Sequence, residues 1–163
     1  MKSLAEAQRY KVMNWKQRAK VIFDVPKPTH FGNYQHCSEC AEHDVTLSTV
    51  DVDSIGLKEL GNPGWDPLCF SSAEGLMYYM PALIRLTLDT IDNPHERYIA
   101  QMLFHLIKDG PGNTLVSACN NSQREFVADF LQYLVDNHSS QIEEDSFTSE
   151  DVLKAHEIWR AEV

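Results

Sequence analysis

The segment from residue 36 to residue 44 is the one part of the sequence that hints at chemistry. It reads His-Cys-Ser-Glu-Cys-Ala-Glu-His-Asp, so Cys37, Cys40 and His43 follow a Cys-x2-Cys-x2-His spacing. Thiolate and imidazole groups are ligands of zinc, and two cysteines at this spacing can bind one ion from a single turn of chain. Because His36 offers a further ring nitrogen, the candidate metal ligands are His36, Cys37, Cys40 and His43.

A structural zinc ion normally takes a second pair of ligands from elsewhere in the chain. This sequence has no second Cys-x2-Cys pair and no His-x3-His pair. Nothing in the sequence selects among the residues that could act as distant ligands. These residues are Cys69, Cys119, His30 and His105. The segment therefore predicts half of a zinc site, with zinc as the cofactor to test.

Two other interpretations of the same segment remain open. On a helix, His36, Cys40 and His43 share one face with Leu47, and that face could pack into the core because free cysteine behaves as a small buried hydrophobe. A Cys-x-x-Cys pair at a helix start can also be redox-active, although the neighbouring acids disfavour a thiolate. On sequence alone, packing is preferred to zinc binding, and zinc binding is preferred to redox chemistry.

Signals for helix starts predict the elements that must position this segment. A Ser, Thr or Asn followed three residues later by an acid can satisfy the free amides of a first helical turn. A Pro at the first helical position strengthens the signal. The pairs are Ser3 with Glu6, Ser71 with Glu74, Ser122 with Glu125, Thr148 with Asp151, and Asn93-Pro94 with Glu96. Each start leads into apolar residues at helical spacing, so the sequence predicts a helix after each one.

Residues 72–91 are apolar on nearly every side, which is typical of a central buried helix. We therefore expect Leu83 to be fully buried, and Pro81 to kink or break the helix. Residues 45–52 could be a strand or a helix end, and residues 114–116 could be extended. The predicted fold is mainly α: a single compact domain of five or six helices, with a minor short strand pair as its only β feature.

The 163 residues suit one domain, and three segments can be distinguished within it. Residues 1–28 form a basic N-terminal helix or arm, residues 29–70 an irregular Cys/His segment, and residues 71–163 a helical core. The arm holds seven of the 14 basic residues and two of the 24 acidic ones, while the whole chain carries a net charge of −10. The rest of the chain is therefore acidic, which argues against nucleic acid as a partner. We expect the arm to pack on the chain's own acidic surface.

The sequence also bounds the compartment. No apolar run approaches the ~20 residues of a membrane span, and the N-terminus lacks the apolar core of a signal peptide. We therefore expect a cytoplasmic protein whose four cysteines are thiols or metal ligands rather than disulfides.

Three stretches together resemble an uncharacterised bacterial family of the domain-of-unknown-function type. They are His-Cys-x-Glu-Cys at 36–40, PLCFSSAEGLMYYMPALIRLTL at 67–88, and SQREFVADFLQYL at 122–134. The resemblance covers about residues 30–136. It implies a helical bacterial protein from the cytoplasm, and it supplies no activity.

Two classes of function remain for comparison with a structure. The preferred one is a non-enzymatic interaction or accessory domain with a protein partner, in which a structural metal could hold the cysteine cluster. The alternative is a small metal- or thiol-dependent enzyme whose site lies at residues 36–43. An enzyme should place converging charged groups beside a cleft, whereas an interaction domain should present a flat apolar patch.

Overall fold

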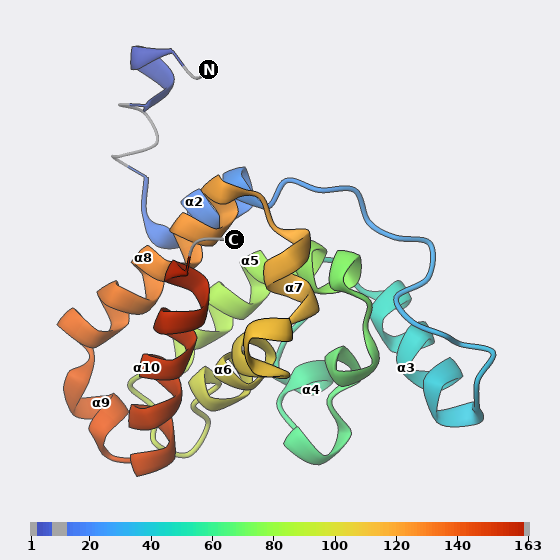
Figure 1. Ribbon diagram of the computed structural model, residues 1–163. Coiled ribbons are helices and arrows are strands. Elements are labelled where there is room, and N and C mark those ends of the chain that lie inside the picture. The colour runs from blue at the N-terminus through green and yellow to red at the C-terminus, as the bar shows by residue number, and fades with distance from the viewer. Residues whose placement is uncertain (1–2, 8–12, 162–163) are drawn as a thin grey trace.

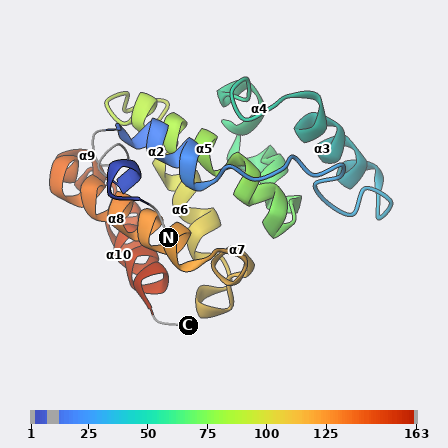
Figure 2. The same cartoon turned by 90° about the horizontal axis from the view of Figure 1, so that it is seen from above.

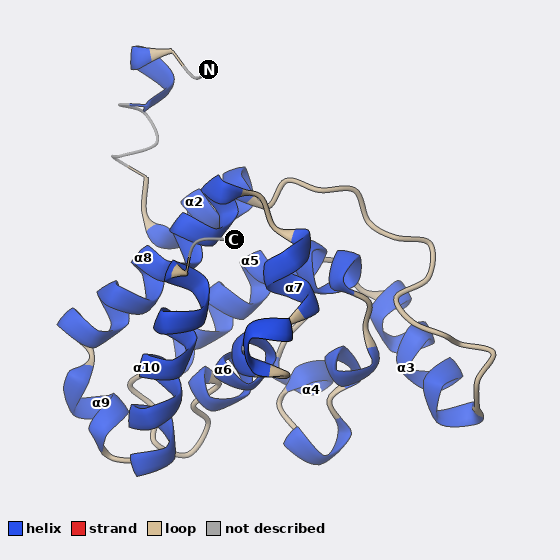
Figure 3. Ribbon diagram, viewed as in Figure 1, coloured by secondary structure: helices blue, strands red, loops and turns tan. Residues whose placement is uncertain are grey.

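The computed structural model describes residues 3–7 and 13–161, and these residues form helices and loops without a β-strand (Figure 3). The prediction of a mainly α fold is confirmed, although the helices are more numerous than the five or six expected. The elements are α2 (Trp15–Ile22), α3 (Ser38–Thr49), α4 (Leu57–Leu60), η1 (Pro63–Trp65), η2 (Pro67–Phe70), α5 (Ala73–Thr90), α6 (Ile99–Ile107), η3 (Gly110–Gly112), α7 (Thr114–Ala118), α8 (Asn121–Asn137), α9 (Ser139–Glu143) and α10 (Ser146–Arg160), where η marks a 3-10 turn. Both segments considered for strands are helical over most of their length, since residues 45–49 end α3 and residues 114–116 begin α7.

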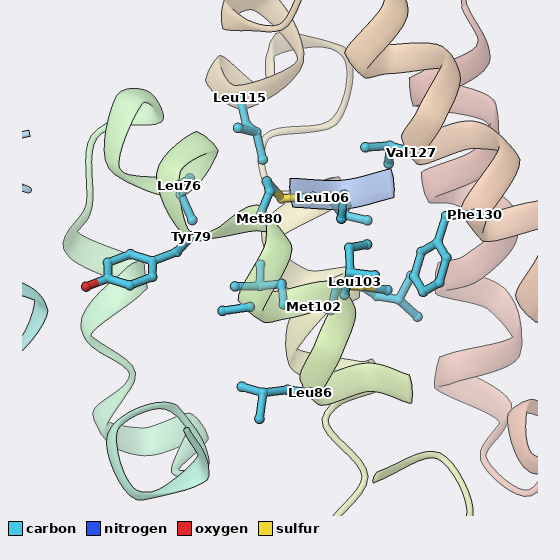
Figure 4. Close-up of a cluster of buried hydrophobic side chains, with 14 of the residues drawn as sticks. Leu76, Tyr79, Met80, Leu86, Met102, Leu103, Leu106, Leu115, Val127 and Phe130 are labelled. Atoms are coloured by element: carbon cyan, nitrogen blue, oxygen red, sulfur yellow. The ribbon is translucent and has the colours of Figure 1, made fainter. Parts of the chain in front are cut away.

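Helix α5 forms the centre of the core, as its apolar surface predicts. Leu83 is 0% exposed, so its expected burial is confirmed. The helix continues through Pro81, so the expectation of a break there is wrong. Figure 4 shows side chains of α5 meeting those of α6 and α8, among them Met80, Leu103 and Phe130. The central helix therefore joins elements from distant parts of the chain.

The C-terminal helices complete this bundle. Helix α10 packs against both α6 and α8, and in Figure 1 it lies across the face of the bundle that they form. Trp159 is 2% exposed, and its indole nitrogen donates a hydrogen bond to the carbonyl of Leu106, at 3.0 Å. This contact fixes α10 against the end of α6.

One predicted helix start is wrong. Residues 94–96 form a turn in which the Asn93 side chain accepts a hydrogen bond from the His95 amide, and α6 begins only at Ile99. The amide of Tyr98 donates to the buried hydroxyl of Thr90, at 2.9 Å. The turn is therefore attached to the end of α5, and the Pro signal marks a loop.

Three other predicted starts, at Ser71, Ser122 and Thr148, are displaced by one to three residues. Where two polar residues compete to cap a helix, the one whose backbone leaves the helical region is the cap. Asn120 caps α8 in a reciprocal pair with Gln123, so these amides replace the predicted Ser and Glu. The observed caps are Ser72 for α5, Asn120 for α8 and Asp145 for α10, in place of Ser71, Ser122 and Thr148.

The basic N-terminal segment contains more than one element. Ser3 and Glu6 do form the predicted reciprocal cap, but α2 has a cap of its own at Asn14. Trp15 at the start of α2 contacts the ring of Phe126 on α8, with centroids 5.6 Å apart. Val12, which belongs to the predicted stripe, lies outside the described residues. Helix α2 packs against α5 and α8, as expected for the basic segment.

Helix α3 lies at the edge of the molecule, away from α8, α9 and α10 in both views (Figures 1 and 2). The hydroxyl of Tyr79 on α5 donates to the carbonyl of Leu47, near the C-terminal end of α3. Asp44 accepts hydrogen bonds from the Phe31 amide at 2.6 Å and shares one with His30 at 2.7 Å. These contacts involve the second half of α3, so its N-terminal end lies at the periphery. None of the helices in the described residues has the length and apolarity needed to cross a bilayer.

Candidate functional site

The start of α3 brings two cysteines onto one turn. Cys37 is the N-cap residue, with an extended backbone, and its sulfur accepts the Cys40 amide at 3.4 Å. A sulfur in this position replaces the hydroxyl or carboxylate that usually caps a helix. The local sequence therefore folds so that Cys37 and Cys40 project from the same helix end.

The three residues His36, Cys37 and Cys40 form what we call the surface cluster. The two sulfurs are 3.3 Å apart, and the Cys40 sulfur is 3.6 Å from Nδ1 of His36. A tetrahedral zinc ion, with bonds of about 2.3 Å to sulfur and about 2.0 Å to nitrogen, holds such atoms roughly 3.5 to 3.8 Å apart. The surface cluster therefore approaches the arrangement of three zinc ligands without a change of fold.

The two thiols of the surface cluster differ in acidity. A hydrogen bond from the Cys40 amide, helped by the side chains of His36 and Cys40, lowers the pKa of Cys37 to about 7. The hydrogen bond with Cys37 raises the pKa of Cys40, and burial together with the charges of Cys37 and Glu39 adds to this increase. One sulfur is therefore available as a thiolate near neutral pH, the form that binds metals or attacks disulfides.

His43, the fourth predicted ligand, lies elsewhere. Its side chain is 2% exposed and packs between the rings of Trp65 and Phe70, with centroid distances of 4.5 and 4.7 Å. Its Nε2 is 3.5 Å from a carboxylate oxygen of Glu39, and neither ring nitrogen makes a hydrogen bond within the described residues. The packing interpretation thus describes His43, whereas Cys37 is exposed and Cys40 is half-buried.

A second group of ligand-type residues was not predicted as a unit. Asp66, Cys69 and His105 place ligand atoms within 4.8 Å of one another, and we call them the buried cluster. Asp66 caps η2, Cys69 belongs to η2, and His105 lies on α6. The carboxylate of Asp66 is 2.8 Å from Nε2 of His105, and both side chains are nearly fully buried.

The distant ligands considered from the sequence therefore separate. Cys69 and His105 meet each other rather than the surface cluster. His30 pairs with Asp44 and stacks on Tyr34. Cys119 is buried, and this burial raises the pKa of its thiol to about 12. The residue that sequence reasoning missed is Asp66, although Asp66-Pro67 is a recognisable start of a helical turn.

Comparison with protein-family models, with curated proteins and with solved structures gives no match for this chain. Its own side chains offer two arrangements with distinct chemistry. The surface cluster presents a thiolate, a thiol and an imidazole to solvent, while the buried cluster combines a carboxylate, a thiol and an imidazole inside the fold. Both are sets that zinc accepts.

Proposed function

We propose that this protein is a non-enzymatic accessory domain that binds zinc through the surface cluster and uses the ion to hold a protein partner. The proposal rests on one observation: Nδ1 of His36 and the sulfurs of Cys37 and Cys40 lie together at an exposed helix start. Three protein ligands leave one of the four positions of zinc for another ligand.

The exposure of the surface cluster favours a binding role over catalysis. Catalytic metals usually lie in dry, shaped cavities, because exclusion of water strengthens their effect on a substrate. His36 and Cys37 are exposed, so a side chain of another molecule could approach the ion directly. The alternative, a small enzyme with its site at residues 36–43, loses support because His43 is enclosed by aromatic rings.

A dithiol redox role is a second candidate, supported by the pKa of about 7 at Cys37. In that reaction the Cys37 thiolate would attack a disulfide of a partner and release one partner thiolate. Cys40, after losing its proton, would then displace the second partner sulfur and close a Cys37–Cys40 disulfide. The partner disulfide is reduced to two thiols, and the cysteine pair is oxidised.

Metal analysis of protein purified without a His-tag or chelator tests the proposal. We expect the surface cluster to account for about one zinc per chain, which Cys40→Ser should remove and which His95→Ala, at an exposed histidine in a turn, should retain. Loss of this zinc should leave the helical circular dichroism unchanged, since α3 is anchored at its other end. Metal content unaffected by Cys40→Ser would contradict the proposal. Rapid formation of a Cys37–Cys40 disulfide by metal-free protein with a model disulfide would instead support the redox role.

A further inference from the structure

The buried cluster joins two segments that are 39 residues apart in the sequence. The turn η2 contributes Asp66 and Cys69, and α6 contributes His105 from the opposite side. Oxygen, sulfur and nitrogen ligands are thus gathered inside the protein within 4.8 Å of one another. Zinc sites in proteins use these three ligand types.

The charge inside the buried cluster favours a cation. Asp66 is 4% exposed, and the ion pair found for it among the described residues is the one with His105. One carboxylate oxygen accepts the Leu68 amide at 2.9 Å, while the other lies 2.8 Å from His105. A buried carboxylate is costly unless it is paired or coordinates a metal. A divalent ion bound there would neutralise the Asp66 charge.

A second feature of this part of the core is the buried hydroxyl of Tyr98. Tyr98 is 1% exposed, and its hydroxyl has no hydrogen-bond partner in the part of the chain that the structure describes. Burial raises the pKa of Tyr98 well above its usual value, and the charges of Asp66 and Cys69 add to this effect. The phenol therefore lies within the field of the buried cluster. An unpaired buried hydroxyl is unfavourable, so this region of the core holds a polar group that the described residues leave unsatisfied.

A pocket of about 260 Å³ adjoins the buried cluster and is lined by two of its three residues. Its wall includes Asp66 and Cys69 from one side and Gln101 and Phe104 of α6 from the other. An ion could reach the ligand atoms through this pocket. A coordination position not filled by the protein would face the pocket and hold water or a small anionic ligand.

We propose that Asp66, Cys69 and His105 bind a zinc ion beside this pocket, whose wall includes the first two of them. The site is separate from the surface cluster, and it remains a candidate if the surface cluster binds nothing. A nucleophilic role for Cys69 fits the structure less well, because a carboxylate beside a half-buried sulfur disfavours the free thiolate. The same carboxylate attracts a cation.

Zinc and Co²⁺ titrations of the full chain in the Cys40→Ser background isolate the buried cluster. We expect about one equivalent of tightly bound metal there, with a sulfur-to-cobalt charge-transfer band, and we expect a further Cys69→Ser substitution to remove both. Cys119→Ser is the matched control, since Cys119 is a buried cysteine outside both clusters. Metal binding that survives Cys69→Ser would overturn the proposal.

A second measurement avoids substitutions in the interior. In the unsubstituted chain, zinc should slow alkylation of Cys69 at least about tenfold, because a coordinated sulfur is not free to react. Mass spectrometry of the peptides reports Cys69 separately from Cys37 and Cys40. Protection of Cys37 and Cys40 without protection of Cys69 would refute the buried site and leave the proposed function intact. Protection of Cys69 without protection of Cys37 and Cys40 would support the buried site and contradict the proposed function.

Discussion

The surface cluster and the buried cluster use the same ligand chemistry in opposite environments. The surface cluster comes from five consecutive residues at one helix start and faces solvent, whereas the buried cluster comes from two elements and lies inside the fold. Hydrogen bonding lowers the pKa of Cys37 at the surface, but burial raises the pKa of Cys69 in the interior. The environment, rather than the residue type, therefore decides which thiol is reactive without metal.

The two clusters should also differ in their contribution to stability. The surface cluster lies at the N-terminal end of α3. Hydrogen bonds to Asp44 and from Tyr79 attach this helix to the body further along its length. The buried cluster itself connects η2 to α6 through the pair of Asp66 and His105. Removal of a side chain should therefore lower the stability of the fold at the buried cluster but leave it nearly unchanged at the surface cluster.

His105→Ala is expected to have the largest effect. It removes the closest hydrogen-bond partner of the buried Asp66 carboxylate, and leaving a buried charged group short of a partner costs more than the roughly 1–3 kcal/mol of a neutral one. Urea unfolding followed by circular dichroism measures the change. His36→Ala is the matched control at the exposed cluster, and in protein freed of metal with a chelator it should leave the unfolding midpoint unchanged. Equal midpoints for both variants would show that the pair with Asp66 contributes nothing to the fold.

Leu83→Ala should destabilise both regions together, because α5 packs against α6 and also holds α3 through Tyr79. Deleting a fully buried leucine costs about 2–5 kcal/mol. Leu153→Ala on α10 is the control, since Leu153 is 64% exposed. Unfolding should remain a single transition whether it is followed by circular dichroism or by exposure of Cys119. Separate transitions would mean that the core around Cys119 unfolds independently of the remaining helices.

Asp44→Ala tests how the surface cluster is attached. Burial opposes ionisation of Asp44, but hydrogen bonds from His30 and the Phe31 amide outweigh it and lower the pKa of this carboxyl. Its removal leaves the buried Phe31 amide without its acceptor, which costs about 1–3 kcal/mol. Glu42→Ala, at an exposed acid on the same helix, is the control. A similar loss of stability in both variants would assign the effect to helix charge instead.

The contribution of Asp44 should also depend on pH, with a definite sign. Because the folded-state pKa is lower than that of the unfolded chain, the carboxylate stabilises the fold above the unfolded value of about 3.9. That stability is lost as the pH falls through the lower, folded-state pKa. The difference in unfolding midpoint between the original chain and Asp44→Ala should therefore shrink in acid.

The comparison also shows what the sequence could predict. Local spacing placed His36, Cys37 and Cys40 together, because residues within one turn are neighbours in almost any helical fold. The same reasoning included His43 wrongly, since spacing alone does not tell which side of a helix faces Trp65 and Phe70. Sequence reasoning was reliable for contacts within a turn and less reliable for the direction in which a helix packs.

Long-range pairing lay beyond this reasoning. Cys69 and His105 were both considered as ligands, but only the packing of η2 near α6 brings them to Asp66. The burial of Leu83 followed from an apolar surface on every side of its helix, whereas the start of α6 did not follow from Asn93-Pro94. Tertiary hydrogen bonds such as that between Tyr98 and Thr90 decide such boundaries, and no local pattern encodes them.

The smallest expected effect concerns the thiols themselves. In protein treated with a chelator, the alkylation rate of Cys37 should rise with pH and level off above an inflection near 7, its folded-state pKa. The rate at Cys119 should remain negligible at these values, because burial holds its pKa at about 12. Peptide mass spectrometry resolves the two sites in one experiment. An inflection at Cys37 near the unperturbed value of about 8.5 would show that the helix start does not stabilise its thiolate.

The same lowered pKa predicts a small dependence of stability on pH. The Cys37 thiolate is more favourable in the folded chain than in the unfolded one, so its contribution is complete above the unfolded pKa and disappears as pH falls through about 7. The unfolding midpoint of the original chain, relative to Cys37→Ser, should therefore rise slightly between pH 7 and about 8.5. No such rise should accompany Cys119→Ser, because the Cys119 thiol stays protonated throughout that range. An equal rise of the midpoint difference with pH for Cys37→Ser and Cys119→Ser would show that the pH dependence does not come from the Cys37 thiolate.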